Sequence, residues 1–312
     1  MIGIDVGGAN LKLADGQGVH IHYCPLWTGA PIADLLRPYA GAGDDEPAAV
    51  VMSGELADCF ENKLQGIAFI VNAVREVFPK AWFYGTDALF HDSPVPALAA
   101  ANWLASADYL RERYPDAVLL DIGSTTADII PLSEFSSLMG LTDLVRLRKG
   151  YLVYTGMLRT PVATLLSSVD LGGIRTPVST EYFASSADAH LVLGHITPGD
   201  YTCNTPDNKE KTTAASLRRL ARVVCADLEE IGEDGAREIA GAFWDRQKEI
   251  VCGAVRRAQK ECGASSVIVA GLGARLFARE LGGTDLNQAL GPVADALPAF
   301  AVREVALRTR GN

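Results

Sequence analysis

Two short segments of this chain combine an aspartate with a turn of small residues, a pattern that suits the binding of a phosphorylated molecule. In the first segment, residues 2–13, the positions of interest are Asp5, Gly7, Gly8, Asn10 and Lys12. Glycines let backbone N–H groups approach an anion closely, because no Cβ stands in the way. The asparagine and the lysine add a side-chain donor and a positive charge. This segment therefore predicts one half of a phosphate-binding site.

The second segment, residues 119–131, repeats the same frame about a hundred residues later. Its positions of interest are Asp121, Gly123, Ser124, Thr125, Thr126 and Asp128. The three hydroxyls can donate to phosphate oxygens. Carboxylates such as those of Asp5, Asp121 and Asp128 are hard ligands suited to hydrated Mg²⁺, although Asp128 also fits a solvent-facing position on a strand. Together the two segments predict a grip on a di- or triphosphate with its metal.

A third glycine element lies nearer the end of the chain. Here an apolar run, residues 266–270, leads into Gly271, Leu272 and Gly273, and a helical pattern follows. The N-terminus of a helix is a favourable place for a phosphate, so Gly271 and Gly273 are candidates for a nucleotide-like or substrate pocket. The full G-x-G-x-x-G spacing is missing, so close helix packing explains these glycines equally well.

The apolar periodicity predicts the elements that must position these residues. Both Asp–Gly segments have the pattern of a strand, a turn and a second strand. Helical spacing is found at residues 62–78 and 98–114, and each of these stretches ends before a proline. The remaining predicted elements are strands at 81–84, 150–154 and 266–271, helices at 213–231, 234–260 and 274–281, and a last helix after about residue 287.

The duplicated hairpin predicts an α/β protein of two lobes. Lobe I would comprise residues 1–115 with about 287–312, and lobe II residues 116–286. A stretch at about 170–211 is rich in Gly, Pro, Ser, Thr and Asp, so we expect an irregular insertion that lines a site. No long linker separates the halves, which indicates tightly coupled lobes.

Composition excludes several classes of protein. The chain has 312 residues, 48% of them hydrophobic, and a formal net charge of −10, so it can bury a core but lacks the basic surface of a general nucleic-acid binder. Small anions respond instead to local charge. We find no membrane-length apolar run, no signal-peptide pattern and no C-x-x-C pair. We therefore expect a cytoplasmic protein that binds neither nucleic acid nor membrane; a homo-oligomer is left open.

Further motifs give the chain a family resemblance. Residues 119–132 and 154–161 resemble the hydantoinase/oxoprolinase-like branch of the actin/sugar-kinase/Hsp70 ATPase superfamily. Residues 52–66 and 182–190 are more selective and resemble the methanofuran-biosynthesis synthases, whose bacterial relatives belong to tetrahydromethanopterin-linked C1 transfer and formaldehyde oxidation. The resemblance covers essentially the whole chain. It implies two RNase H-like lobes of mixed sheet with flanking helices, which is the actin-like ATPase fold.

The resemblance also implies a reaction. An aminomethylfuran-methyl diphosphate would be joined to the phenol of a tyramine- or tyrosine-type substrate, with Mg²⁺, to give an aryl ether and pyrophosphate. A phenol has a pKa of about 10, so a base would help, and Glu55, Asp188 and His190 are the candidates. Asp58 or Asp188 could hold the aminomethyl cation. The alternatives are a helix-start role for Glu55 after a Ser53 cap, and plain loop roles for Asp188 and His190.

The same hairpins also fit other functions. With Gly271 and Gly273, they are compatible with an ATP-dependent kinase or a hydantoinase/oxoprolinase-like amidohydrolase, for which ATP would be the cofactor. A non-catalytic binding protein of this fold is a further alternative. The sequence contains no P-loop, H-E-x-x-H or G-x-S-x-G motif, and no aspartate of the sugar-kinase type is recognisable. This favours a fold that is used for a reaction other than phosphoryl transfer.

Overall fold

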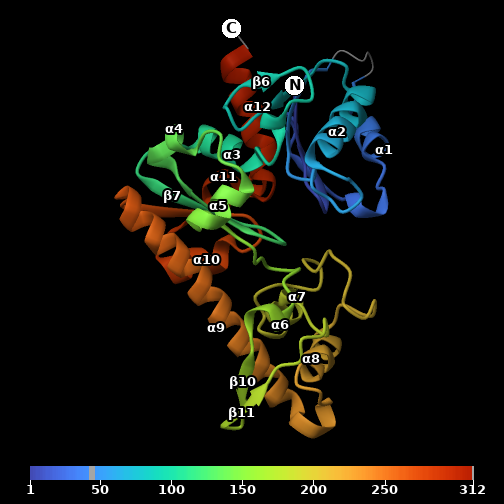
Figure 1. Cartoon of the computed structure of the whole chain (residues 1–312), viewed down its shortest axis with the longest axis vertical. Coiled ribbons are helices and arrows are strands. Elements are labelled where there is room, and N and C mark those ends of the chain that lie inside the picture. Colours follow the sequence, from blue (N-terminus) through green and yellow to red (C-terminus); the bar gives the residue numbers. More distant parts are fainter. Residues whose placement is uncertain (42–45, 311–312) are drawn as a thin grey trace.

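The computed structural model describes residues 1–41 and 46–310. Residues 42–45 and 311–312, which fall within the range predicted for lobe I, lie outside the described residues. Two sheets with their helices form the upper part of the molecule in Figure 1. A third, mostly helical unit forms the lower part.

The first sheet has the strand order β3-β2-β1-β4-β5-β6. Strands β1 to β3 pair antiparallel, whereas β4 pairs parallel to β1 and β5 parallel to β4. Every residue of β1 and of β4 is buried, because helices cover both faces of the sheet. The strands are β1 (Ile2–Val6), β2 (Asn10–Ala14), β3 (Val19–Tyr23), β4 (Ala48–Met52), β5 (Ala81–Tyr84) and β6 (Phe90–His91).

The second sheet repeats this connectivity. Its order is β13-β12-β7-β8-β9, with β7 to β9 antiparallel, β12 parallel to β7 and β13 parallel to β12. The strands are β7 (Ala117–Ile122), β8 (Ala127–Pro131), β9 (Leu152–Val153), β12 (Ser266–Ala270) and β13 (Thr284–Asp285). The chain therefore has the two α/β lobes that the repeated hairpin predicted, and each lobe has the mixed sheet that the family resemblance implied.

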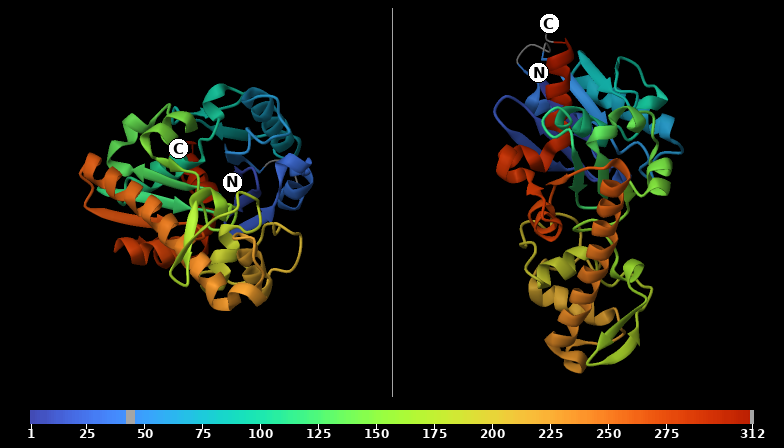
Figure 2. Two further views of the ribbon diagram at one scale, coloured as in Figure 1. Left: turned by 60° about the horizontal axis from the view of Figure 1, so that its bottom comes forward. Right: turned by 90° about the vertical axis from the view of Figure 1, so that its left-hand side faces the viewer.

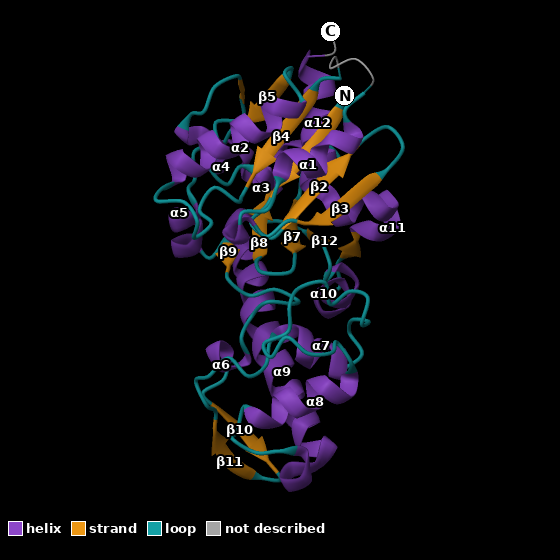
Figure 3. Cartoon of the chain, turned by 90° about the vertical axis from the view of Figure 1, so that its right-hand side faces the viewer, coloured by secondary structure: helices purple, strands orange, loops and turns teal. Residues whose placement is uncertain are grey.

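Helices α3 and α12 lie between the two sheets and join the lobes through one core (Figures 1 and 3). Side chains along β4 alternate between the two faces of the first sheet. Val50 and Met52 pack against α2 in the core of lobe I, whereas Val51 packs with Trp103 of α3 in the core that the two lobes share. The helices of the lobes are α1 (Ile32–Leu36), α2 (Lys63–Val77), α3 (Asn102–Leu110), α4 (Phe135–Leu138), α5 (Asp143–Lys149), α10 (Ala274–Leu281), α11 (Leu286–Leu290) and α12 (Leu297–Arg310).

The stretch at 170–211 is mainly irregular, as we predicted, but it is not a loop insertion alone, because it includes two strands and a helix. It belongs to a third unit with a hydrophobic core of its own, which includes Val162, Leu220 and Phe243. This unit projects away from the two lobes, and α9 connects it to lobe II (Figures 1 and 2). Its elements are α6 (Val162–Leu165), the antiparallel pair β10 (Ser168–Leu171) and β11 (Ile174–Pro177), α7 (Ser186–Val192), α8 (Thr213–Arg222) and the first part of α9 (Leu228–Cys262).

Other boundaries differ for local reasons. The helix predicted at 98–114 is shortened to α3, because Ala100 has a φ of 48°, which is left-handed and ends a helical run. The break predicted between residues 231 and 234 is present inside α9, where Gly232 has φ 67° and ψ 174°. Helix α5 was not predicted at all. Among residues 1–41 and 46–310, no helix has the length and apolar character needed to cross a membrane.

We predict that Gly232→Ala destabilises the third unit. The φ and ψ of Gly232 lie in a region that is almost restricted to glycine, so a Cβ there should cost about 1–3 kcal/mol. Gly241→Ala is the matched control in the same helix, because a Cβ at Gly241 meets no atom within 4 Å and alanine favours a helix. Urea unfolding should show a loss for the first variant and no loss for the second. Equal unfolding free energies for the two variants would show that the kink does not require glycine at position 232.

Candidate active site

The turns that follow β1 and β7 face a single cavity between the lobes, with a volume of about 250 Å³. All eight predicted phosphate-binding residues line it, together with the three aspartates predicted to bind metal. The lining residues are Asp5, Gly7, Gly8, Ala9, Asn10, Lys12, Ser53, Ala100, Asn102, Asp121, Gly123, Ser124, Thr125, Thr126, Asp128, Asp143, Arg146, Leu152, Tyr154, Arg159 and Pro298. The fold thus brings the two repeated segments together at one site.

The two turns have equivalent backbone geometry. The Gly7 amide donates to the Asn10 carbonyl at 2.9 Å, and the Gly123 amide donates to the Thr126 carbonyl at 3.0 Å. A Cβ added at Gly8 or Gly123 would meet no atom within 4 Å, so both glycines border open space. A phosphate in the cavity could therefore approach the backbone of either turn closely.

The residues paired across each hairpin differ between the lobes. Asp5 of β1 lies opposite Lys12 of β2, whereas Asp121 of β7 lies opposite Asp128 of β8. Residues opposite one another on antiparallel strands have neighbouring side chains. The Lys12 ammonium also donates to the Asp295 carbonyl at 2.9 Å. The cavity therefore has one carboxylate beside a lysine and a second beside another carboxylate.

Burial dominates the electrostatics of Asp5 and Asp121. It raises the pKa of Asp5 to about 7, with Lys12 opposing the shift and Asp121 and Asp128 adding to it. Burial likewise raises the pKa of Asp121 to about 6, with Lys12 opposing and Asp128 adding. Asp5 is 4% exposed, and its Oδ1 atom has no hydrogen-bond partner among residues 1–41 and 46–310. Such carboxylates fit a divalent cation that takes one or two protein ligands and completes its shell with phosphate oxygens and water.

Asp128 is neither a solvent-facing strand residue nor a carboxylate free to bind a metal, because it lines the cavity and pairs with Arg146. The guanidinium of Arg146 donates to its carboxylate, while the same guanidinium pairs with Asp143 at 2.9 Å. In the part of the chain that the structure describes, no group of three His, Cys, Asp or Glu side chains is placed to hold a metal. The described residues therefore do not form the predicted three-aspartate metal site, and Asp5 and Asp121 are the candidates that are left.

Gly271 and Gly273 do not line the cavity. A Cβ at Gly271 would lie 2.5 Å from the Ile122 carbonyl oxygen and 2.6 Å from the Asp121 carboxylate, and Gly271 has a φ of 83°. The Gly273 amide donates to the same Ile122 carbonyl at 3.2 Å. These glycines allow β12 and α10 to pack against the end of β7. The geometry therefore supports the alternative that these glycines serve close packing, and the prediction that Gly271 and Gly273 form a nucleotide-like or substrate pocket is wrong.

Glu55 lies behind the cavity wall and does not line it. It is 2% exposed, its Oε2 atom has no hydrogen-bond partner in the described part of the chain, and burial raises its pKa. Its carboxylate accepts a hydrogen bond from the Ala100 amide, and Ala100 does line the cavity. The helix-start alternative is also wrong, because Asn62 caps α2. Asp58 is exposed and lies outside the lining.

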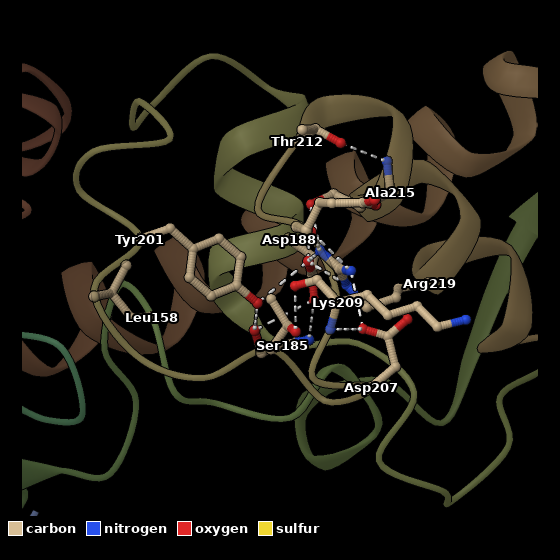
Figure 4. A network of polar contacts seen from close by, with 12 residues as sticks. Leu158, Ser185, Asp188, Tyr201, Asp207, Lys209, Thr212, Ala215 and Arg219 are labelled. Carbon is tan, nitrogen blue, oxygen red and sulfur yellow. Dashed lines mark hydrogen bonds and ion pairs between the residues drawn. The ribbon is translucent and has the colours of Figure 1, made fainter.

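Asp188 belongs to the core of the third unit (Figure 4). Its carboxylate is fully buried, forms an ion pair with Arg219 at 2.7 Å and accepts the Ser216 hydroxyl at 2.8 Å. It also accepts the Ser185 amide at 3.0 Å, which makes it part of the capping box of α7. A carboxylate with so many partners is a poor base. We therefore correct its assignment from a catalytic or loop residue to a structural one.

His190 is also buried away from the cavity. Its Nε2 donates to the Gln247 side-chain oxygen at 2.8 Å, and its Nδ1 lies 3.0 Å from that of His195. Burial lowers the pKa of His190 to about 3, so it is neutral at physiological pH. Gln247 in turn donates to Thr155 Oγ1 and the Gly156 carbonyl, both at 2.9 Å. His190 therefore supports the 155–160 loop and is not positioned as a base.

Several cavity residues were missed by the sequence analysis. Asn102 begins α3, and the unpredicted helix α5 supplies Asp143 and Arg146. Tyr154 and Arg159 lie in the 154–161 motif, which the sequence marked as family-like without assigning them a role. That motif was the available signal, whereas nothing in the local pattern around α5 pointed to the cavity.

Comparison with known proteins adds a family assignment. The model of the hydantoinase/oxoprolinase family matches residues 46–301. A protein of Methanocaldococcus jannaschii named (4-{4-[2-(gamma-L-glutamylamino)ethyl]phenoxymethyl}furan-2-yl)methanamine synthase is 35% identical over 98% of this chain and 97% of its own length. The protein of the same name from Methanococcus vannielii is 37% identical over 52% of this chain and 73% of its own length.

Solved structures give weaker matches. An activator of 2-hydroxyisocaproyl-CoA dehydratase from Clostridium difficile with bound ADPNP has a TM-score of 0.42 and 11% identity, over 100% of this chain and 97% of that one. A non-polymerising A278D mutant of MamK bound to AMPPNP has a TM-score of 0.40 and 14% identity, over 100% of this chain and 98% of that one.

We predict that Asp188→Asn acts on stability and leaves the chemistry intact. Removing the charge leaves the buried Arg219 guanidinium under-compensated, which should cost about 3 kcal/mol of unfolding free energy. Asp234→Asn, at an exposed position of α9, is the control and should change little. Unfolding curves and turnover below the unfolding transition are the measurements. A variant of normal stability with strongly reduced turnover would restore Asp188 as a catalytic residue.

We predict that Asp5→Asn stabilises the metal-free protein at high pH. The raised pKa means that folded Asp5 binds its proton more tightly than unfolded Asp5, so the unfolding free energy falls as pH rises from about 4 to about 7. The variant should therefore be more stable than the wild type by about 1–3 kcal/mol at pH 8, and the gain should fade towards pH 4.

The same pair of proteins tests the cation site. Mg²⁺ should raise the melting temperature of the wild type at pH 8, because it compensates the buried charge, and should have little effect on Asp5→Asn. Thermal melts with and without Mg²⁺, across pH 4–8, are the measurement. An equal response of both proteins would show that Asp5 does not contribute to cation binding.

Proposed function

We propose that this chain forms the aryl ether of a methanofuran-type coenzyme. It is an enzyme that belongs to the hydantoinase/oxoprolinase family and to the family of the furan-2-yl-methanamine synthases. The proposed substrates are an aminomethylfuran-methyl diphosphate and a phenol of the tyramine or tyrosine type. The carbon–oxygen bond to the diphosphate breaks, the phenol oxygen bonds to the furan methylene carbon, and pyrophosphate and a proton are released. The enzyme is then a transferase with a diphosphate leaving group.

One observation carries this proposal: the two Asp–Gly turns meet at one cavity that is suited to a diphosphate. Gly8 and Gly123 leave backbone open to an anion, and Ser124, Thr125 and Thr126 bring hydroxyl donors. Lys12 supplies a positive charge beside Asp5. A diphosphate has two anionic groups, so two equivalent turns, one from each lobe, match its charge.

The cavity residues have distinct roles in the proposal. Asp5 and Asp121 would hold Mg²⁺. The bound cation would supply positive charge that stabilises the departing pyrophosphate. The glycine and hydroxyl donors of the turns bind the phosphate oxygens and orient the diphosphate for in-line attack. The furan ring can stabilise positive charge on the adjacent carbon, so little activation of the phenol is needed.

The acceptor of the phenol proton is reassigned in this proposal. Glu55, Asp188 and His190 do not line the cavity, and two of the three are fully engaged in other contacts. Among the carboxylates that line the cavity, Asp143 pairs with Arg146 through its Oδ1 atom, but its side chain is 37% exposed and can still contact a substrate there. We therefore place the base among the cavity carboxylates, where the acceptor phenol must also enter.

The proposal is tested by direct assay with both substrates. The protein with Mg²⁺ should release pyrophosphate and form the ether in equal amounts. Asp121→Asn should lower turnover by about a hundredfold or more, because it removes a charge that would hold the cation, while the fold stays intact. Asp170→Asn, exposed on β10 in the third unit, should retain full turnover.

Three outcomes would contradict the proposal or a part of it. Folded wild-type protein that yields neither pyrophosphate nor ether with Mg²⁺ present would remove the transferase assignment. Hydrolysis of ATP, or its consumption during turnover of either substrate, would favour the kinase or amidohydrolase alternative. Unchanged turnover and Mg²⁺ dependence in Asp121→Asn would show that the carboxylate at the end of β7 does not bind the metal.

A further inference from the structure

Three basic side chains line the cavity, and two of them already have partners within the protein. The Lys12 ammonium donates to the Asp295 carbonyl at 2.9 Å, and the Arg146 guanidinium pairs with Asp128 and Asp143. The third is Arg159, and within residues 1–41 and 46–310 its guanidinium has no carboxylate partner and no hydrogen bond. It is therefore the cavity cation with its full donor capacity available.

Backbone contacts fix Arg159 to the second phosphate-binding turn. Its amide and that of Leu158 both donate to the Ser124 carbonyl at 3.0 Å, and the Met157 amide donates to the Gly123 carbonyl at 2.9 Å. Gly156 allows this approach, since a Cβ there would lie 2.5 Å from the Thr125 nitrogen. The side chain of Arg159 thus starts from a rigid position at the cavity wall.

Trp27 is attached to the first turn in a similar way. The Leu26 amide donates to the Gly8 carbonyl at 3.0 Å, and the Cys24 amide donates to the Ala9 carbonyl at 2.9 Å. The Arg159 guanidinium carbon lies 4.6 Å from the centre of the Trp27 ring, and the ring is 37% exposed. This cation–π contact therefore joins the two turns, one from each lobe, beside the cavity.

We infer that Arg159 binds the diphosphate directly and that its stacking on Trp27 holds the guanidinium in place for this contact. The inference rests on the proposed function, since it names a further binding residue of the same site. The contact with the ring uses no hydrogen bond, so the guanidinium N–H groups have no acceptor among the described residues. Those groups match two phosphate oxygens in a bidentate contact, which a lysine cannot reproduce. A bound diphosphate would then contact both lobes through one side chain.

The test is the binding of Mg²⁺-pyrophosphate, measured by calorimetry on the full chain without turnover. Arg159→Ala should weaken binding about 10- to 100-fold, and Arg159→Lys should recover only part of the loss. Trp27→Leu, which keeps the arginine, should weaken binding about three- to tenfold. Arg218→Ala, exposed on α8 in the third unit, is the matched control and should bind like the wild type.

Each outcome decides between clear alternatives. Wild-type binding that is unchanged in a folded Arg159→Ala variant would overturn the inference and leave the proposed function standing. An effect of Arg159→Ala without any effect of Trp27→Leu would overturn the role of the stacking. If folded wild-type protein binds no Mg²⁺-pyrophosphate, both the inference and the proposed function fail. Tighter binding of Mg²⁺-ATP than of pyrophosphate, lost in Arg159→Ala, would keep the arginine site and replace the proposed substrate.

Discussion

The burial of Asp5 and Asp121 at the ends of two central strands is the constraint on which the site depends. Taking a carboxylate out of water is costly unless a charge or hydrogen bonds compensate it, and no residue that the structure describes bonds to the Oδ1 atom of Asp5. The cost is visible in the raised pKa of both groups. It is tolerated because each aspartate lies on the first strand of a hairpin within a rigid, fully covered sheet. A site with uncompensated negative charge is prepared for a cation and, through it, for a polyanion.

Close backbone packing keeps these strand ends in place. Gly271 touches the Asp121 carboxylate, Gly156 touches the backbone of the second turn, and Gly54 touches the Gly7 carbonyl. At each of these positions a Cβ would come within about 3 Å of the neighbouring chain. The glycines are thus spread along the sequence but share one structural role. They let supporting segments approach the two turns so closely that the cavity has a fixed shape.

Repetition made much of this architecture predictable. The Asp–x–Gly frame at Asp5 and at Asp121 predicted two hairpins, and a hairpin followed by parallel strands gives both sheets the same connectivity. The residues that face the cavity from these hairpins were found for the same reason. The prediction that Asp188 and His190 are catalytic was wrong, because polar residues in a Gly- and Pro-rich stretch are also typical of a binding loop. Only the tertiary contacts with Arg219 and Gln247 reveal that these side chains are buried.

The third unit is nevertheless connected to the cavity, because polar side chains of α7 and α9 form hydrogen bonds with the 155–160 loop. From α7, the Ser186 hydroxyl accepts the Thr160 amide at 3.1 Å, and His190 holds the Gln247 side chain of α9. Gln247 then donates to Thr155 and Gly156 in the loop that packs on the second turn. Every polar atom in this chain of contacts is buried, so a lost partner would leave another group unsatisfied. The motif at 182–190 therefore acts on the site from a distance, by fixing the loop that carries Arg159.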